Sequence, residues 1–467
     1  MTSSGHLGDD TRAALQALGA DTSAPGGRTV SAAAMIAAAD VVSAALRAKG
    51  CAPDEPVVLF VANEPPHLAG FLGIWLAGCV AAPIHVTTPA AAADALVARL
   101  GSRFAVRAGA VSAIGDAAPP KRRLLSGAAL IVFTSGSTGQ PKGVVVGHTA
   151  LAWKLGALSR LLGFRRDAVV AVPLQLTFIF GIWVSLLALQ SGSKLLLTPK
   201  LAQSPKKVLG DATVLAAVPT LLRTLTAAPA LNAPRLRAVL TGGEPFPPAL
   251  AERVAHCCPA ARIIDLFGLT ETGSCDFVAD FGAGAPVAGT IGRPTEGVDF
   301  RIAAASPPLP GGAGELQIRT PARMLGYLDD PALTQQAFAD VYFRTGDLAR
   351  LRDDGCVELV GRSKDIISRG GNKIGPLEIE NMILGHEGVA AALAFGLPDE
   401  RLGETLQVMI VRRDPTLTEA ALRGWARERI ERYKLPDAIH FVDTLPVGRT
   451  GKADRGAARL ALQRERP

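Results

Sequence analysis

The chain has 467 residues, of which 48% are hydrophobic and 19% are charged, and this balance excludes global disorder and predicts about three structural units of roughly 150 residues each. The formal net charge is +7, but no basic run is longer than Lys121-Arg122-Arg123, so we expect no nucleic-acid partner. Six cysteines in 467 residues are too few for a disulfide scaffold, and the absence of a C-x-x-C pair gives no support to a zinc or redox motif. We therefore expect a reducing, cytoplasmic compartment.

The first half of the chain alternates between predicted helices and strands. The first 27 residues are polar, with a weak helix signal and no signal-peptide pattern. Residues 31–49 predict a helix with Ser31 at its N-cap, 57–61 a buried strand and 66–79 an apolar helix. Further strands are predicted at 129–133, 169–172, 195–198, 214–218 and 238–241. Because helical stretches separate several of them, we expect α/β layers with mostly parallel strands.

Two long stretches, 68–89 and 168–193, contain no Asp, Glu, Lys or Arg. Either is long enough to span a bilayer. Proline, glycine and polar residues interrupt both of them, for example Pro173 and Gln175 in the second stretch. We therefore predict buried core and no membrane span, with a strand followed by a helix in the second stretch.

The pattern changes after about residue 285, where short β-type runs alternate with Gly/Pro turns. This part predicts a small β-rich unit. The last hundred residues predict a separate α+β unit with a helix at 417–434. The expected fold class is α/β, with a large N-terminal part of several subdomains, namely α/β layers and the β-rich unit, and a small α+β C-terminal part.

The most informative motif directly follows the apolar strand at 129–133. It combines hydroxyl side chains, glycines and one lysine: Thr134, Ser135, Gly136, Ser137, Thr138, Gly139, Lys142 and Gly143. Glycines let the backbone turn and expose its N–H groups to an anion, and lysine supplies a compact positive charge. The motif therefore predicts a loop that wraps a triphosphate. Its spacing is not G-x-x-x-x-G-K-[ST], which disfavours a P-loop ATPase or kinase.

The run from Phe133 to Gly143 resembles the phosphate-binding signature of the adenylate-forming superfamily, which includes acyl-CoA synthetases, luciferases and the adenylation domains of peptide synthetases. Further motifs of this family occur in the same order and cover nearly the whole chain. The resemblance implies an AMP-binding N-terminal domain at 1–364 and a mobile C-terminal lid domain at 365–467, with the hinge at Asp365.

The resemblance also implies an adenine site. In the family, the turn Gly242-Gly243-Glu244 contacts adenine, and the aromatic residue that follows Asp265 by two positions stacks on it. This aromatic residue is Phe267 here, where the family usually has Tyr, so one hydroxyl is lost and the stacking face is kept.

Ribose, phosphate and metal contacts are implied by four further residues. Asp347 would accept hydrogen bonds from the ribose hydroxyls, and Arg362 would make a second ribose or phosphate contact. Thr270 would contact phosphate and the adenylate, and Glu271 would bind Mg²⁺, which prefers carboxylate and phosphate oxygens.

The closing motif of the family ends near the C-terminus. Here the resemblance makes Lys452 a catalytic residue that meets the substrate carboxylate and the α-phosphate. Rotation about Asp365 would withdraw Lys452 and bring Gly370-Gly371 to the site, where these glycines would let a phosphopantetheine arm pass.

The segment that corresponds to the family's His-x-x-G gate begins with Phe178 and has no titratable group. The candidate acyl pocket and gate comprise Phe178, Gly181, Trp183, Gly268 and Leu269, although aromatic residues near buried strands are also typical of ordinary core. No Arg or Lys occurs within 168–193 to pair with a second carboxylate, and no Asp there would hold an amino group. An aryl or medium-length acyl acid is therefore favoured.

The sequence predicts an AMP-forming acid–thiol ligase that uses ATP and Mg²⁺ to convert a small carboxylic acid to an acyl-adenylate, and then transfers the acyl group to CoA. The alternative acceptor is the phosphopantetheine of a carrier protein, since both share the same thiol arm. We expect a monomer or a homodimer. A non-catalytic binding protein is disfavoured because Lys452, Glu271 and Asp347 are all present.

Overall fold

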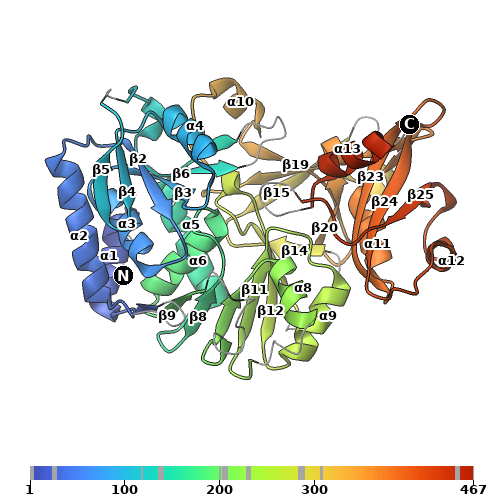
Figure 1. Ribbon diagram of the computed structural model, residues 1–467, viewed down its shortest axis with the longest axis horizontal. Helices are drawn as coiled ribbons and strands as arrows, with labels where there is room; N and C mark the ends of the chain where they lie inside the picture. The colour runs from blue at the N-terminus through green and yellow to red at the C-terminus, as the bar shows by residue number, and fades with distance from the viewer. Residues whose placement is uncertain are drawn as a thin grey trace.

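The computed structural model describes residues 5–23, 29–116, 119–134, 141–198, 201, 209–227, 233–281, 290–305, 309–447 and 453–465. In Figure 1 a large N-terminal part, coloured blue to yellow, stands beside a small C-terminal part in orange and red. The fold is α/β, with a large and a small domain, as predicted.

The first unit is a seven-stranded sheet with the order β17-β7-β6-β3-β2-β4-β5. Its strands are β2 (Pro56–Val61), β3 (Val80–His85), β4 (Phe104–Arg107), β5 (Ala110–Ala113), β6 (Ala128–Thr134), β7 (Lys142–Gly147) and β17 (Gly326–Tyr327). The central pairs are parallel, and β7 and β17 add to one edge in antiparallel fashion. Helices α2 (Ala32–Ala48) and α3 (Pro65–Leu76) share a core with one face of this sheet, and α4 (Ala90–Leu100) shares one with the other. The side chain of Ser31 accepts a hydrogen bond from the N–H of Ala34, which confirms the predicted N-cap.

The second sheet has thirteen strands and joins two units of the large domain. Its parallel part contains β1 (Thr22–Ser23), β8 (Val169–Val172), β9 (Lys194–Leu197), β10 (Val214–Ala216), β11 (Ala238–Gly242) and β12 (Arg262–Phe267). Helices α5 (His148–Leu162) and α6 (Ile179–Gln190) lie between the two sheets and share one core with both. Helices α8 (Pro219–Ala227) and α9 (Pro248–Cys257) cover the opposite face.

The remaining strands of this sheet are antiparallel and form the predicted β-rich unit. They are β13 (Phe277–Asp280), β14 (Thr290–Pro294), β15 (Asp299–Ala304), β16 (Gly314–Arg319), β18 (Phe338–Ala339), β19 (Tyr342–Leu351) and β20 (Val357–Arg362). The short helix α10 (Pro331–Gln336) contacts β17 and β18. Strand β13 pairs with β12 on one side and with β14 on the other, so the sheet continues without a break from one unit into the next.

The small domain is built on its own five-stranded sheet. It contains β21 (Ile367–Arg369), β22 (Asn372–Ile374), β23 (Val389–Asp399), β24 (Gly403–Arg412) and β25 (Ala438–Phe441), with α11 (Pro376–Leu384), α12 (Glu419–Arg427) and α13 (Arg455–Glu465). Among the described strands, none of these pairs with a strand of the large domain. The change of sheet occurs between Arg362 and Ile367, a span that contains Asp365.

Two segments differ from what the sequence predicted. The N-terminal segment forms a full helix, α1 (Leu7–Leu18), because Leu7 and Leu15 are buried where α1 contacts α3 and α6. The helix predicted at 417–434 was too long, since α12 ends at Arg427. The chain then turns so that the buried ammonium of Lys434 reaches the carboxylate of Glu378 at 2.6 Å.

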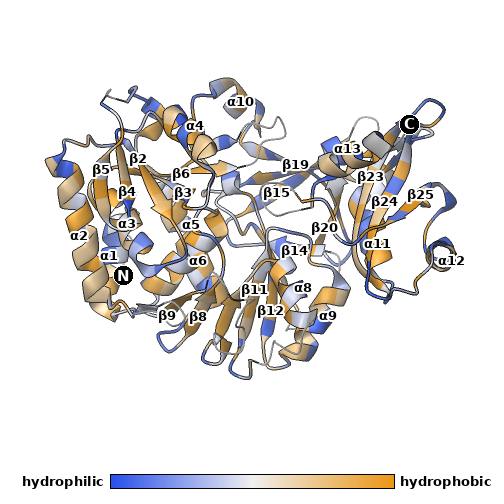
Figure 2. Cartoon of the chain, viewed as in Figure 1, coloured by the Kyte–Doolittle hydropathy of each residue, from blue (hydrophilic) through white to orange (hydrophobic). Residues whose placement is uncertain are grey.

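The uncharged stretch at 168–193 forms β8 and α6, as predicted, and apolar residues of both elements are buried. In Figure 2 the strands around β8 and β11 are coloured mostly as hydrophobic residues. Within the described ranges, no helix combines the length and the apolar character needed to cross a membrane.

Candidate active site

The predicted phosphate loop connects two hydrogen-bonded strands. Thr134 at the end of β6 is the Cα partner of Lys142 at the start of β7. On the far side of the loop, the guanidinium of Arg99 donates to the carbonyl of Pro141. The predicted contacts Ser135, Gly136, Ser137, Thr138 and Gly139 lie outside the described residues.

Lys142 lies next to a tyrosine that sequence analysis missed. The ammonium of Lys142 is 5.2 Å from the centroid of the Tyr327 ring, and Tyr327 pairs through β17 with Val144 of β7. The Tyr327 hydroxyl donates to Oε1 of Glu271 over 2.9 Å. Three segments that are distant in the sequence therefore meet at Glu271. Only the pairing of β17 with β7 places Tyr327 there, so no local pattern would have identified it.

Glu271 is the middle residue of a 3₁₀ turn (Thr270–Thr272) that follows β12. The carbonyl of Glu271 accepts a hydrogen bond from the N–H of Met324 at 2.7 Å. The turn is thus attached through its backbone to the segment that leads into β17. Thr270 and Glu271 are both half-buried, so their side chains remain accessible to a ligand.

The predicted adenine turn lies at the carboxyl ends of two parallel strands. Gly242 is the Cα partner of Leu266, and a Cβ on Gly242 would meet the carbonyl oxygen of Leu266 at 2.3 Å. Gly243 has φ +81°, a conformation that favours glycine. The carboxylate of Glu244 accepts hydrogen bonds from the N–H and the hydroxyl of Thr220, at 3.0 and 2.7 Å, and so holds the start of α8. Glu244 therefore has a structural function besides the adenine contact predicted for it.

Asp265 and Thr241 are opposite each other on β12 and β11. Both are buried, and burial raises the pKa of Asp265 to about 8. The Thr241 hydroxyl has no hydrogen-bond partner among the described residues. Phe267, at the end of β12, packs edge-on against Phe277 with 6.1 Å between ring centroids. The ends of β11 and β12 thus carry one buried hydroxyl without a partner among the described residues, a buried carboxyl and an aromatic ring.

Asp347 and Arg362 are Cα partners on β19 and β20, and Nε of Arg362 donates to Oδ1 of Asp347 at 2.8 Å. Asp347 is 5% exposed, and its Oδ2 has no partner among the described residues. Burial raises the pKa of Asp347 despite the nearby guanidinium, which lowers it. An acceptor that is buried and without a partner suits a ligand hydroxyl, because leaving it unpaired costs about 1–3 kcal/mol.

The predicted hinge residue takes part in an ion-pair network at the start of α13. Arg455 lies 3.8 Å from Asp365 and 2.6 Å from Glu380, and it also donates to the carbonyl of Ala394. Burial raises the pKa of Glu380. Lys452, three residues before Arg455, lies outside the described residues, although Val447 and Ala453 on either side of its loop form a β-bridge.

Gly370 and Gly371 form the two-residue turn between β21 and β22. Their φ angles are +54° and +81°, and the flanking residues Arg369 and Asn372 are Cα partners. This is the positive-φ geometry of a tight hairpin, so the local turn by itself favours glycine at both positions. A Cβ on Gly371 would meet no atom within 4 Å. The hairpin tip is therefore open around Gly371.

The predicted acyl-pocket residues do not share one environment. Phe178 precedes α6 and is 41% exposed, whereas Trp183 is fully buried and stacks on Phe180 with 5.3 Å between centroids. The indole N–H of Trp183 has no partner among the described residues. A Cβ on Gly181 would meet the carbonyl of Gln175 at 2.4 Å, and one on Gly268 would meet the N–H nitrogen of Cys275 at 2.2 Å. Leu269 is half-buried and packs on two of the apolar cores.

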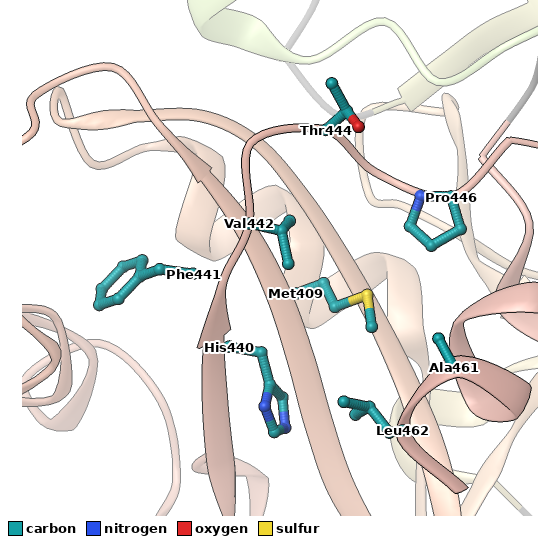
Figure 3. A pocket seen from close by; sticks show the side chains of 8 residues that line it. All are labelled: Met409, His440, Phe441, Val442, Thr444, Pro446, Ala461 and Leu462. Carbon is teal, nitrogen blue, oxygen red and sulfur yellow. The ribbon is translucent and has the colours of Figure 1, made fainter. Parts of the chain in front are cut away.

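Two cavities lie away from these residues. One of about 480 Å³ is on the small domain between β24, β25 and α13, where Figure 3 shows Met409, His440 and Leu462 around it. The other, of about 40 Å³, is lined by Arg350 of β19 and by Lys373 and Lys434 of the small domain. Neither cavity is lined by a residue predicted to bind the nucleotide or the acid.

The carboxylate of Glu271 fits a magnesium ion shared with a nucleotide. Tyr327 occupies its Oε1, and Oε2 has no partner among the residues that the structure describes. Among all the residues that the structure describes, no group of three or more His, Cys, Asp and Glu side chains could hold a metal ion without other ligands. Mg²⁺ commonly takes one or two carboxylates and completes its shell with water and substrate phosphates, so one available carboxylate near a phosphate loop is a suitable donor set.

Family models match most of the chain. The AMP-binding enzyme model covers residues 10–126 and 108–328, and the model of the AMP-binding enzyme C-terminal domain covers 378–452. The chain is 31% identical to a feruloyl-CoA synthase of an Amycolatopsis species over 447 residues, which cover 89% of this chain and 90% of that protein. It is 28% identical to a long-chain-fatty-acid–CoA ligase of Mycobacterium tuberculosis over 444 residues, with 87% and 88% covered.

Solved structures have the same fold. ATP-bound MatB from Rhodopseudomonas palustris superposes with a TM-score of 0.87 at 24% identity, and the match covers 98% of this chain and 99% of that one. The anthranilate CoA ligase AuaEII, in complex with anthranoyl-AMP, gives a TM-score of 0.86 at 22% identity, with 98% and 97% covered. The chain therefore belongs to the AMP-binding enzyme family and, within it, to the acyl-CoA ligase type, whose members use ATP and form carbon–sulfur bonds.

Proposed function

We propose that this protein is an AMP-forming acid–CoA ligase that activates an aryl or medium-length acyl acid with Mg·ATP. The observation that carries the proposal is the convergence at Glu271, where Lys142 lies beside Tyr327 and Tyr327 donates to the Glu271 carboxylate. A cation at the end of a hydroxyl-rich loop and a carboxylate with one available oxygen suit a metal-bound triphosphate.

In the first half-reaction, a carboxylate oxygen of the acid attacks the α-phosphorus of ATP, and the bond to the β-phosphate oxygen breaks. The acyl-adenylate forms and pyrophosphate leaves. Lys142 binds the departing phosphates, and Glu271 would hold the Mg²⁺, which would neutralise part of their charge. Asp347 accepts hydrogen bonds from the ribose through Oδ2. Lys452 stabilises the negative charge that grows at the α-phosphate in the transition state.

In the second half-reaction, the thiolate of CoA attacks the acyl carbon, and the bond from this carbon to the AMP oxygen breaks. The site must first release Lys452 and admit the phosphopantetheine arm. Rotation of the small domain about Asp365 would do both, and Asp365 contacts Arg455 of that domain at 3.8 Å. The open hairpin tip at Gly370-Gly371 then lines the path of the arm.

The residues of the candidate acid pocket favour a substrate acid with an aryl or another uncharged acyl group. Helix α6 and the strand before it contain no Arg or Lys, so a second carboxylate would have no cation in this segment. One relative with 31% identity is named a feruloyl-CoA synthase, and another with 31% identity, which matches 71% of this chain, is named a 2-succinylbenzoate–CoA ligase. Another relative, 28% identical, is a malonate–CoA ligase, and malonate would carry that second carboxylate. An uncharged aryl acid is therefore the first substrate to test, and malonate is the contrasting one.

The decisive experiment is acid-dependent exchange of pyrophosphate into ATP in the absence of CoA. Ferulate, benzoate, octanoate and malonate are compared at equal concentration, and CoA or a phosphopantetheinylated carrier protein is added afterwards. We expect exchange with ferulate, benzoate or octanoate and release of AMP when CoA is supplied. If AMP is released only with the carrier protein, the acceptor is the carrier protein and not CoA. Exchange only with malonate would contradict the proposed substrate class. No exchange with any acid would contradict the proposed activity.

A further inference from the structure

A buried ion pair lies behind the turn that carries Glu271. Nζ of Lys154, on α5, is 3.0 Å from Oδ1 of Asp276, and both side chains are 0% exposed. The proposed chemistry uses neither residue. Moving two charges out of water is energetically costly, and apolar residues of similar volume often stabilise a fold equally well or better. Stability alone is therefore a poor explanation for this pair.

Each charge of the pair binds the segment that directly follows Glu271. The ammonium of Lys154 donates to the carbonyl of Cys275 at 3.3 Å. The carboxylate of Asp276 accepts a hydrogen bond from the hydroxyl of Thr272, the last residue of the turn. The two side chains thus connect helix α5 to the turn at residues 270–272.

The backbone of this segment is held in an unfavourable conformation. Gly273, Ser274 and Cys275 have φ angles of +76°, +67° and +55°. For Ser274 and Cys275, which have a Cβ, the left-handed region is sterically unfavourable. Ser274 donates its N–H to the carbonyl of Leu269 at 2.7 Å, so the chain reverses tightly after Glu271. A reversal of this kind persists only where its surroundings over-determine it, and the ion pair supplies part of that constraint.

We propose that Lys154 and Asp276 are positioning residues for Glu271. Their contacts with Thr272 and Cys275 fix the reversed segment, and the fixed segment holds the Glu271 carboxylate where it binds the magnesium of Mg·ATP. The inference rests on the proposed function in one respect, namely that Glu271 is a metal ligand. Residues that orient a ligating group commonly change metal affinity or activity 10–100-fold when they are replaced.

The test compares Lys154→Met, Asp276→Asn and the double variant Lys154→Met/Asp276→Asn. The matched control is Arg160→Met on the same helix, which removes the 2.8 Å ion pair with Glu296, where both partners are more than half exposed. Two quantities are measured for each protein: the melting temperature without ligand, and the Mg²⁺ concentration that gives half of the increase in melting temperature caused by ATP. ATP with a chelator is the blank. The second quantity reports metal binding and requires no acid.

We expect each single variant to melt at a lower temperature, since it leaves one buried charge without its partner. The Mg²⁺ concentration for half of the ATP effect should rise about tenfold or more. The double variant removes both charges, so it should regain most of the lost stability and still need the higher Mg²⁺ concentration. If the double variant regains the Mg²⁺ dependence of the wild type together with its stability, the pair is only structural and the proposal is wrong. An unchanged Mg²⁺ requirement in the single variants would also overturn it.

Thr272→Val provides the test if the charge variants do not fold. It removes the hydroxyl that joins the turn to Asp276 and leaves the ion pair in place, so the Mg²⁺ requirement should again rise; an unchanged requirement would refute the link. Failure of the proposed function gives a different result. A wild-type protein that is stabilised by Mg·ATP but exchanges pyrophosphate with no acid lacks the activity, and the variants still decide the positioning inference. No response to Mg·ATP in the wild type would overturn the inference, because Glu271 would then bind no metal.

Discussion

Replacing Tyr327 with phenylalanine isolates one hydrogen bond at the centre of the proposed site. The Tyr327 hydroxyl donates to Oε1 of Glu271 at 2.9 Å, and the ring lies 5.2 Å from the ammonium of Lys142. Phenylalanine retains the ring and its contact with the cation, so the variant removes only the hydroxyl. Burial and the nearby Glu271 carboxylate raise the pKa of Tyr327, so the hydroxyl keeps its proton throughout the pH range of an assay.

The expected loss follows from the burial of the two partners. A hydrogen bond to a charged group contributes about 1.5–3 kcal/mol. Tyr327 is 4% exposed, but Glu271 is only half-buried, so water can replace part of the lost bond. The low end of the range, about 1.5 kcal/mol, corresponds to roughly a tenfold decrease in kcat/KM for Mg·ATP.

The assay is pyrophosphate exchange with the best acid, titrated with ATP and with Mg²⁺. Tyr342→Phe is the matched control, since its hydroxyl donates to the carboxylate of Asp299 at 2.7 Å and neither group belongs to the proposed site. A decrease in kcat/KM of less than about twofold in Tyr327→Phe, or an equal decrease in the control, would show that this hydrogen bond does not support the proposed site.

Three further predictions concern other parts of the site. Asp347→Asn should raise KM for ATP by about tenfold or more, because the variant weakens an acceptor for the ribose hydroxyls. KM for 3′-deoxy-ATP, which lacks one of these hydroxyls, should rise less. An equal rise in KM for both nucleotides would contradict this assignment. Asp265 has its pKa raised by burial to about 8 from an ordinary value of 3.8, so it holds its proton more tightly in the folded state, and stability should fall as the pH rises from about 4 to 8. Asp265→Asn should therefore remove this slope in melting temperature, and parallel pH profiles for variant and wild type would count against it. Lys452→Ala should abolish adenylation and spare transfer from a supplied acyl-adenylate to CoA, measured as AMP release; equal loss of both half-reactions would contradict a mechanism with two domain poses.

Local patterns in the sequence predicted the elements that depend on neighbouring residues. The hydroxyl of Ser31 caps α2, as its position before an alanine-rich run indicated. The uncharged stretch at 168–193 divided into a strand and a buried helix, because Pro173 and Gln175 interrupt it. The family resemblance extended this to the adenylate-forming fold, since its motifs occur in order along the chain.

Contacts between distant residues could not be predicted in the same way. Tyr327 and Glu271 are 56 residues apart, and Lys154 and Asp276 are 122 apart. Neither pair has a local signature, because strand pairing and helix packing decide which side chains meet. The helix predicted at 417–434 was too long for a similar reason, since Lys434 turns toward Glu378. The roles of Asp347, Lys452 and the acyl-pocket residues remain predictions.

The unbroken path of hydrogen bonds from β11 through β12, β13, β14 and β20 to β19 has a consequence for cooperativity. The strand ends that carry the adenine candidates and the strand that carries Asp347 belong to one sheet, so local opening of either unit disrupts backbone pairing in the other. Such a sheet tends to unfold as one cooperative block. The five-stranded sheet of the small domain shares no described strand pair with this block. Opening of the small sheet therefore need not disrupt the backbone pairing that joins the strand ends with the adenine candidates to the strand that carries Asp347.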